Sequence, residues 1–310
     1  MKIVFMGTPD FAVSALKALH EDGHDISLVV TQPDKPKGRG HKMAPPAVKV
    51  YAEENGLNVY QPMSCKTDET YEHLLKENAD LFVVAAYGQI LPQRILDIPK
   101  YGCINIHASL LPKYRGAAPI QWSIINGEKK TGVTTMQMNA GLDTGDMLIK
   151  KEVIIENTEN LETLHDKLAE AGVDAIRETI AAIESGTLKP EKQNDDESTY
   201  APMISKATGY LDFNKEMESI YNLIRGLNPF PYASTTYKGG RFKVISAVCV
   251  ELDKNAENGK ILDVSHDGIL VKCTGGAILI KEVQFEGKKK MPVSEYIKGN
   301  KIEIGEVLGG

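Results

Sequence analysis

Residues 2–31, KIVFMGTPDFAVSALKALHEDGHDISLVVT, establish the architecture of the first half of the chain. Lys2–Met6 is a short apolar run typical of a buried strand, and Phe11–Asp22 repeats apolar residues at helical spacing until Gly23. Ile26–Thr31 is a second apolar run. A strand, a helix and a second strand in this order predict a parallel β–α–β unit, whose ligands bind beyond the carboxyl ends of the strands.

The same alternation continues along the first half of the chain. Helical patterns occupy Ala47–Asn55 and Asp68–Glu77, and apolar runs follow at Leu81–Ala86, Cys103–His107 and Val133–Met138. We therefore expect an α/β fold with a Rossmann-like, mainly parallel sheet in the N-terminal domain.

The pattern changes towards the C-terminus. A strand-like run at Leu148–Ile155 and a long helical pattern at Leu161–Ile183 lead into a polar stretch, Ser185–Thr199, without periodicity. A further helix is expected at Met217–Leu227. Five short strand patterns without helical crossovers then predict a small, OB-like β-barrel domain: Ala233–Tyr237, Phe242–Val250, Lys260–Val264, Ile269–Cys273 and Ala277–Val283. We place the N-terminal domain at residues 1–188, a linker at 189–206 and the barrel at 207–310.

Composition excludes several classes of protein. The 310 residues carry a net charge of −6, and the four cysteines form no CxxC pair, which argues against a disulfide framework and a cysteine-based zinc site. The opening MKIVFM is too short for a signal sequence and no later stretch approaches a membrane span, so we expect a cytoplasmic protein. The GTPDF segment lacks the GxGxxG spacing of a dinucleotide site, which makes an NAD-dependent oxidoreductase a poor fit.

The most informative polar residues follow two strands. Asn105 and His107 are two apart at the carboxyl end of an apolar strand, so both side chains emerge on one face. We expect the loop after the next strand, Asn139–Asp146, to bring Asp143 against His107. An Asn amide can donate to a developing oxyanion, a His can transfer protons near neutral pH, and an Asp can fix its tautomer and favour its charged form. Spacing alone also fits ordinary hydrogen-bonded structural residues.

The segment Asn105–Pro112, NIHASLLP, resembles the motif of the folate-dependent formyltransferases, whose catalytic Asn, His and Asp match Asn105, His107 and Asp143. Three more segments are similar to this family: GTPDF at 7–11, YGQI at 87–90 and RGAAPIQ at 115–121. The resemblance implies transfer of a formyl group from 10-formyltetrahydrofolate to an amine without a metal. Since no Ser or Cys stands where a nucleophile is needed, we expect direct transfer.

The resemblance also assigns binding residues. It places the folate against one loop and one turn, comprising Tyr87, Gly88, Gln89, Ile90, Ser109, Leu110, Leu111 and Pro112. It makes initiator methionyl-tRNA the expected acceptor and places its methionine side chain at Phe11. A core phenylalanine at the start of a helix is the alternative for that residue.

A basic loop favours tRNA over a small acceptor. Residues 32–43 hold four positive charges, Lys35, Lys37, Arg39 and Lys42, against one Asp, and the resemblance matches Arg39 to an arginine that enters the acceptor arm. Residues 206–310 hold 15 Lys and Arg against 13 Asp and Glu, a net charge of +2 beside −8 for residues 1–205. Expected tRNA contacts there are Lys206, Lys243, Lys288, Lys289 and Lys290, although a run of lysines is also typical of a solvated turn.

Two other activities share such a catalytic core. An amino-sugar formyltransferase would be indifferent to RNA, and a formyl-folate hydrolase would release formate without an acceptor. The basic loop favours the tRNA reading, and we expect a monomer.

Overall fold

The computed structural model describes residues 1–37 and 42–309, so the predicted contact Arg39 lies outside the described residues. The chain divides into two compact units. The first contains Met1–Gly116, Lys130–Ile154 and His165–Ala201, and the second contains Ala117–Lys129, Ile155–Leu164 and Pro202–Gly310. The boundaries at 188 and 206 stay predictions.

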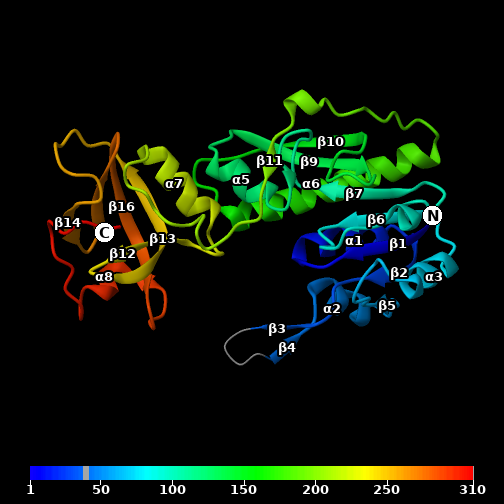
Figure 1. Cartoon of the computed structure of the whole chain (residues 1–310), viewed down its shortest axis with the longest axis horizontal. Coiled ribbons are helices and arrows are strands. Elements are labelled where there is room, and N and C mark those ends of the chain that lie inside the picture. The colour runs from blue at the N-terminus through cyan, green and yellow to red at the C-terminus, as the bar shows by residue number, and fades with distance from the viewer. Residues whose placement is uncertain (38–41, 310) are drawn as a thin grey trace. The chain divides into compact units, whose positions relative to one another are not determined.

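The first unit is built on a seven-stranded sheet in the order β10-β9-β7-β6-β1-β2-β5 (Figure 1). Strands β5, β2, β1, β6 and β7 pair in parallel, whereas β9 and β10 run antiparallel at one edge. The mainly parallel sheet predicted from the sequence is thereby confirmed. The bounds are β1 Lys2–Gly7, β2 Asp25–Val30, β5 Val59–Tyr60, β6 Leu81–Ala85, β7 Cys103–His107, β9 Lys130–Gln137 and β10 Met147–Ile154.

Helices cover both faces of this sheet. Val4 and Met6 of β1 pack in a buried cluster with Leu74 and Ile95, whereas the alternate residues Ile3 and Phe5 point to the opposite face. Leu74 lies in α3 (Asp68–Lys76) and Ile95 in α4 (Gln93–Leu96). The other helices of the unit are α1 (Asp10–Glu21), α2 (Ala47–Glu54) and α6 (Leu161–Glu184), whose first turn belongs to the second unit.

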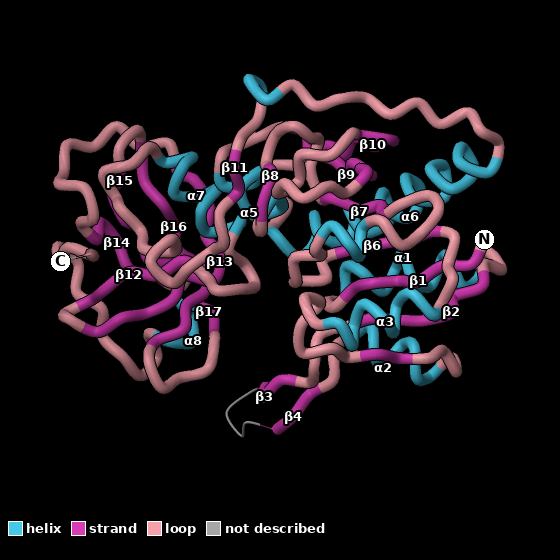
Figure 2. Tube along the Cα trace, turned by 45° about the vertical axis from the view of Figure 1, so that its right-hand side comes forward, coloured by secondary structure: helices cyan, strands magenta, loops and turns pink. Residues whose placement is uncertain are grey.

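Two segments predicted to be irregular contain short strands. The basic loop forms an antiparallel hairpin of β3 (Lys35–Lys37) and β4 (Lys42–Ala44). The stretch predicted as a linker contains a 3-10 turn at Asp195–Glu197 and β11 (Tyr200–Ala201), which pairs in parallel with β8 (Arg115–Gly116). Figure 2 shows the long connection from α6 to β11 as an extended tube. We refer to residues 193–201 as the strap.

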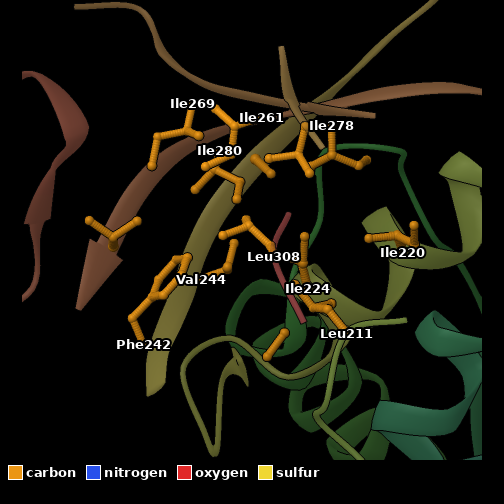
Figure 3. Close-up of a cluster of buried hydrophobic side chains, with 14 of the residues drawn as sticks. Leu211, Ile220, Ile224, Phe242, Val244, Ile261, Ile269, Ile278, Ile280 and Leu308 are labelled. Carbon is orange, nitrogen blue, oxygen red and sulfur yellow. The ribbon is translucent and has the colours of Figure 1, made fainter. Parts of the chain in front are cut away.

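The second unit carries the predicted antiparallel β domain. Its sheet follows the order β12-β13-β16-β15-β14, with β17 paired to β16. The strands are β12 Ala233–Tyr237, β13 Gly240–Val250, β14 Ile261–Ser265, β15 Gly268–Cys273, β16 Gly276–Phe285 and β17 Met291–Pro292, and the helices are α5 Pro119–Ile125, α7 Met217–Gly226 and α8 Val293–Tyr296. Side chains of β13, β14, β15, β16 and α7 form its core, as the labelled residues of Figure 3 show.

Backbone segments outside the sheet cover both of its edge strands. Ile261 of β14 donates its N–H to the Glu306 carbonyl, and the Gly305 N–H donates to the Ile261 carbonyl, both at 2.8 Å. On β12, Ser234 donates to Gly209 at 2.8 Å and accepts from Leu211 at 2.9 Å. Backbone hydrogen bonds along both edge strands are therefore used within the chain.

Candidate active site

The predicted catalytic residues of β7 lie at the carboxyl end of the parallel strands. Asn105 pairs with Val84 of β6 on one side and Met136 of β9 on the other, and His107 pairs with Thr134. Apolar residues alternate with these two, because Ile104 and Ile106 are buried against the opposite face. The strand thus directs Asn105 and His107 to the same face, as the spacing predicted.

His107 is held by a backbone carbonyl. The side chain is 6 % exposed, and its Nε2 lies 2.9 Å from the carbonyl oxygen of Tyr114. A carbonyl only accepts, so Nε2 carries a proton and any second proton resides on Nδ1. The Tyr114 carbonyl therefore favours the tautomer with its proton on Nε2. The Asp143 carboxylate faces the other ring nitrogen, and its role at the imidazole stays a prediction.

Asp143 faces that second nitrogen across a short gap. Its Oδ2 lies 3.8 Å from His107 Nδ1 and accepts the N–H of Gly116 at 2.8 Å. The residue has φ of 51°, a left-handed conformation that side chains rarely adopt, and its side chain is 15 % exposed. The loop after β9 thus brings a carboxylate to His107, as the sequence predicted.

The Asn105 amide is available to a ligand. It is partly buried, and no side-chain hydrogen bond within residues 1–37 and 42–309 involves it. An amide N–H in this position can donate to an oxygen that gains negative charge. Asn105, His107 and Asp143 together provide a neutral donor, a proton carrier and an anion.

Sequence reasoning missed Gln193, which binds the Asp143 loop from the strap. Its Nε2 donates to the carbonyls of Asp143 at 2.8 Å and Gly145 at 2.7 Å, and its Oε1 accepts from Arg115 Nε at 2.9 Å. The surrounding stretch is polar and has no periodicity, so no pattern distinguishes Gln193 from its neighbours. Only the fold brings it to the site.

The loop predicted to contact folate follows β6. Tyr87 is buried and hydrogen-bonds Cys65 Sγ through its hydroxyl at 3.2 Å, and Gln89 binds the Cys65 N–H at 2.9 Å. Burial raises the pKa of the Cys65 thiol and of the Tyr87 hydroxyl, which favours the neutral form of both groups. Gly88 adopts φ of 83°, and Ile90 is 74 % exposed. The loop therefore offers a ligand its backbone and the Ile90 side chain.

The second predicted folate segment is a buried turn after β7. Thr134 Oγ1 donates to the Ser109 carbonyl at 2.7 Å and accepts the Leu111 N–H at 3.1 Å. Ser109 and Leu111 are buried, while Leu110 and Pro112 are partly exposed. Leu110 and Pro112 are the members of this turn that a ligand can touch.

Phe11, the predicted methionine-contacting residue, lies in the first turn of α1. It is buried, and its ring meets the His165 ring edge to face at 5.7 Å between centroids. This position also fits a core phenylalanine, so its role stays a prediction.

The hairpin segment is rich in lysine and contains one acid. Lys35 is exposed, and Lys37 and Lys42 lie in its two strands. The single acid, Asp34, accepts from Lys49 Nζ at 3.0 Å and from Gln61 Nε2 at 2.8 Å. The hydrogen bonds from Gln61 and Lys49 lower the pKa of Asp34, which favours its charged form, and the Lys49 ammonium offsets that charge.

The predicted tRNA-binding lysines of the second unit are at its surface. Lys206, Lys288, Lys289 and Lys290 are exposed, and Lys243 is partly buried with Nζ 5.2 Å from the centre of the Tyr232 ring. Lys288 Nζ also donates to Asn300 at 2.7 Å.

Neither a metal site nor a membrane span is found within residues 1–37 and 42–309. This part of the chain contains no group of three or more His, Cys, Asp or Glu side chains placed so that they could hold a metal ion. No helix in this part of the chain is long and apolar enough to cross a bilayer.

Comparison with known proteins agrees with the geometry. Residues 1–180 match the formyl transferase family, and residues 203–301 match the C-terminal domain of formyl transferases. The chain is 51 % identical over 310 residues to the methionyl-tRNA formyltransferase of Acetivibrio thermocellus, an alignment that covers all of both chains. It is also 51 % identical to the methionyl-tRNA formyltransferase of Clostridioides difficile over 309 residues, again covering all of both chains.

Solved structures share the fold at low identity. The sugar 3N-formyl transferase WlaRD aligns with a TM-score of 0.68 and 21 % identity, covering 93 % of this chain and 99 % of that one. HypX from Aquifex aeolicus in complex with tetrahydrofolic acid aligns with a TM-score of 0.67 and 18 % identity, covering 98 % of this chain and 50 % of HypX. The resemblance seen in the sequence is confirmed, and the chain belongs to the formyl transferase family.

Proposed function

We propose that the protein transfers the formyl group of 10-formyltetrahydrofolate to the amino group of initiator methionyl-tRNA, acting as a monomer in the cytoplasm. The observation that carries this proposal is the meeting of Asn105, His107 and Asp143 at the carboxyl end of the parallel strands. The full-length similarity to methionyl-tRNA formyltransferases supports tRNA as the acceptor.

Asn105 binds the formyl oxygen in this mechanism. The amine attacks the formyl carbon, a C–N bond forms to the methionine nitrogen, and the bond to folate N10 breaks. Negative charge gathers on the formyl oxygen as the amine attacks. The Asn105 amide, which takes part in no side-chain hydrogen bond within residues 1–37 and 42–309, donates to that oxygen where the charge develops.

His107 and Asp143 manage the proton that the amine must lose. Nε2 of His107 is committed to the Tyr114 carbonyl, so proton movement at the ring takes place at Nδ1. The Asp143 carboxylate faces that nitrogen, with its Oδ2 at 3.8 Å. The amine loses one proton and folate N10 gains one, so the chain has no net proton to supply.

The folate is placed by residues that surround the same strand ends. The exposed Ile90 and the partly exposed Leu110 and Pro112 offer apolar surface for a flat ring, and the loop 87–90 offers backbone groups. Buried side chains at Tyr87, Ser109 and Leu111 hold these segments in shape. Structural neighbours include HypX in a complex with tetrahydrofolic acid, which supports a folate ligand.

The tRNA is bound through phosphate contacts from both units. Lys35, Lys37, Arg39 and Lys42 contribute from the basic segment, whose acid Asp34 is neutralised by Lys49. In the second unit the lysines at 206, 243 and 288–290 contribute. Each duplex phosphate contact lowers log affinity by roughly 0.9 per log unit of salt, so tRNA binding is salt-sensitive.

The experiment is transfer of labelled formyl from 10-formyltetrahydrofolate to charged initiator and charged elongator tRNA at two salt concentrations. Rapid, salt-sensitive formylation of the initiator alone supports the proposal. Formylation of an amino-sugar nucleotide with neither tRNA modified would replace it with the small-acceptor reading, and release of formate without an acceptor would indicate a hydrolase.

A further inference from the structure

The strap is bonded to the active site at two places. At one, Gln193 holds the loop that carries Asp143. At the other, Thr199 Oγ1 accepts the Tyr114 N–H at 2.8 Å and the Thr199 carbonyl accepts the Arg115 N–H at 2.9 Å. Tyr114 supplies the carbonyl that binds His107, so the strap supports both groups that flank the imidazole.

Both N–H groups and the oxygen of the Gln193 side-chain amide form hydrogen bonds. The amide nitrogen serves two carbonyls, those of Asp143 and Gly145, on either side of Thr144. The amide oxygen accepts from Arg115 Nε, and Arg115 Nη2 in turn binds Asp195 Oδ1 at 2.7 Å. Glutamine is the side chain that offers two donors and one acceptor at this length.

The loop needs such support. Asp143 has φ of 51°, which is disfavoured for a residue with a side chain, and a conformation of this kind persists when surrounding contacts enforce it. The Gly116 N–H fixes the carboxylate, and Asn139 Oδ1 accepts from the Gly141 N–H and the Thr144 hydroxyl within the loop. Gln193 adds the contacts to the carbonyls of Asp143 and Gly145, on either side of Thr144.

We propose that Gln193 is a positioning residue that sets Asp143 against His107. Gln193 contacts the side chain of neither Asp143 nor His107. It acts through the backbone carbonyls of Asp143 and Gly145. The proposal rests on the proposed function insofar as Asp143 serves formyl transfer. It extends that function by assigning a role to the segment that links α6 to β11.

The first test is Gln193→Met, which keeps the length of the side chain and removes its donors. A displacement of about 1 Å at a catalytic group can lower the rate by about 100-fold, so we expect kcat to fall to that extent with KM for tRNA unchanged. The matched control is Lys192→Met, the same replacement at an exposed neighbour, which should leave kcat intact. Unchanged kcat in Gln193→Met would overturn the proposal.

A double-mutant cycle separates positioning from general loss of structure. If Gln193 acts through Asp143, then adding Gln193→Met to Asp143→Asn should lower kcat little further. A full, multiplicative loss in the double variant would show that Gln193 acts elsewhere and would overturn the proposal.

A readout independent of the reaction is hydrogen exchange at the Gly116 amide. That N–H is bound by Asp143, so Gln193→Met should speed its exchange while the amides of β1 keep their protection. Failure of the wild-type protein to formylate methionyl-tRNA would refute the proposed function alone. Unchanged Gly116 exchange in the variant would refute the positioning role alone.

Discussion

Nδ1 of His107 lies 3.8 Å from Oδ2 of Asp143, and the Nε2 of the same ring is bound to the Tyr114 carbonyl at 2.9 Å. The longer distance exceeds a hydrogen bond, so the carboxylate acts on the ring through its charge. Nε2 thus faces a carbonyl and Nδ1 faces a carboxylate. The two ring nitrogens therefore meet groups of different chemistry, and only the Nε2 contact is within hydrogen-bond distance.

Asp143→Asn should lower kcat by about 100-fold or more while the protein stays folded. The amide oxygen can still accept the Gly116 N–H, but the negative charge opposite Nδ1 is lost. Single-turnover formylation measures the effect, and the thermal midpoint checks the fold. A variant with nearly normal turnover would remove Asp143 from the mechanism.

Asn105→Ala should lower turnover by about 100- to 1000-fold, because a donor to the developing oxyanion is removed. Asn255→Ala changes the same residue type at an exposed position of the second unit and should have no effect. Both proteins are compared by steady-state kinetics with methionyl-tRNA at saturation. Equal activity of the two variants would show that Asn105 has only a structural role.

Replacing Lys35, Lys37 and Lys42 together by Ala should raise KM for tRNA and flatten its salt dependence. The slope of log affinity against log salt should fall by roughly 0.7 to 0.9 for each phosphate contact that is lost. The control replaces three exposed lysines of the same unit, Lys66, Lys76 and Lys189. A salt slope equal to that of the wild type would mean that the hairpin lysines contact no phosphate.

Gly145→Ala should abolish most activity, because an added Cβ would overlap the Gln137 carbonyl oxygen and force the Asp143 loop to move. Gly299→Ala is the control, since a Cβ there meets nothing within 4 Å. Turnover and the exchange rate of the Gly116 amide should change together in the first variant. Normal turnover in Gly145→Ala would show that the loop tolerates displacement.

The ion pair of Asp22 and Arg177 should make stability depend on acid pH. Arg177 donates to Asp22 at 2.6 and 2.7 Å and holds the pKa of that carboxyl below its ordinary value of 3.8. A lowered pKa stabilises the fold above the unfolded pKa, and this contribution is lost as pH falls through the folded pKa. Urea unfolding should therefore show Asp22→Asn less stable than the wild type at neutral pH, with the gap closing as pH falls below the ordinary carboxyl pKa of 3.8. A gap independent of pH would contradict this.

The sequence was informative where local pattern determines structure. The first β–α–β unit was predicted from the apolar run of β1 and from Gly23, which follows α1 and has a positive φ. The shared face of Asn105 and His107 was predicted from their spacing on β7. These features depend on periodicity and on backbone sterics, which neighbouring residues determine.

Contacts between distant segments could not be predicted in this way. The Tyr114 carbonyl fixes the His107 tautomer, yet a backbone carbonyl carries no sequence signal. Gln193 reaches Asp143 from 50 residues away through a stretch whose polar composition is also typical of a linker. The pairing of Asp34 with Lys49 was likewise not predictable, because the two residues are 15 positions apart and only the fold brings their side chains together.

The covered edges of the second unit bear on whether its sheet can pair with a strand from another molecule. An open edge strand displays unpaired N–H and C=O groups that can take up a strand from another molecule. Here Ile261 of β14 is bonded to residues 305 and 306, and Ser234 of β12 to residues 209 and 211. A strand from a second copy would have to displace these segments before it could pair. The chain's own segments thus occupy edge positions that a strand from another molecule would otherwise use.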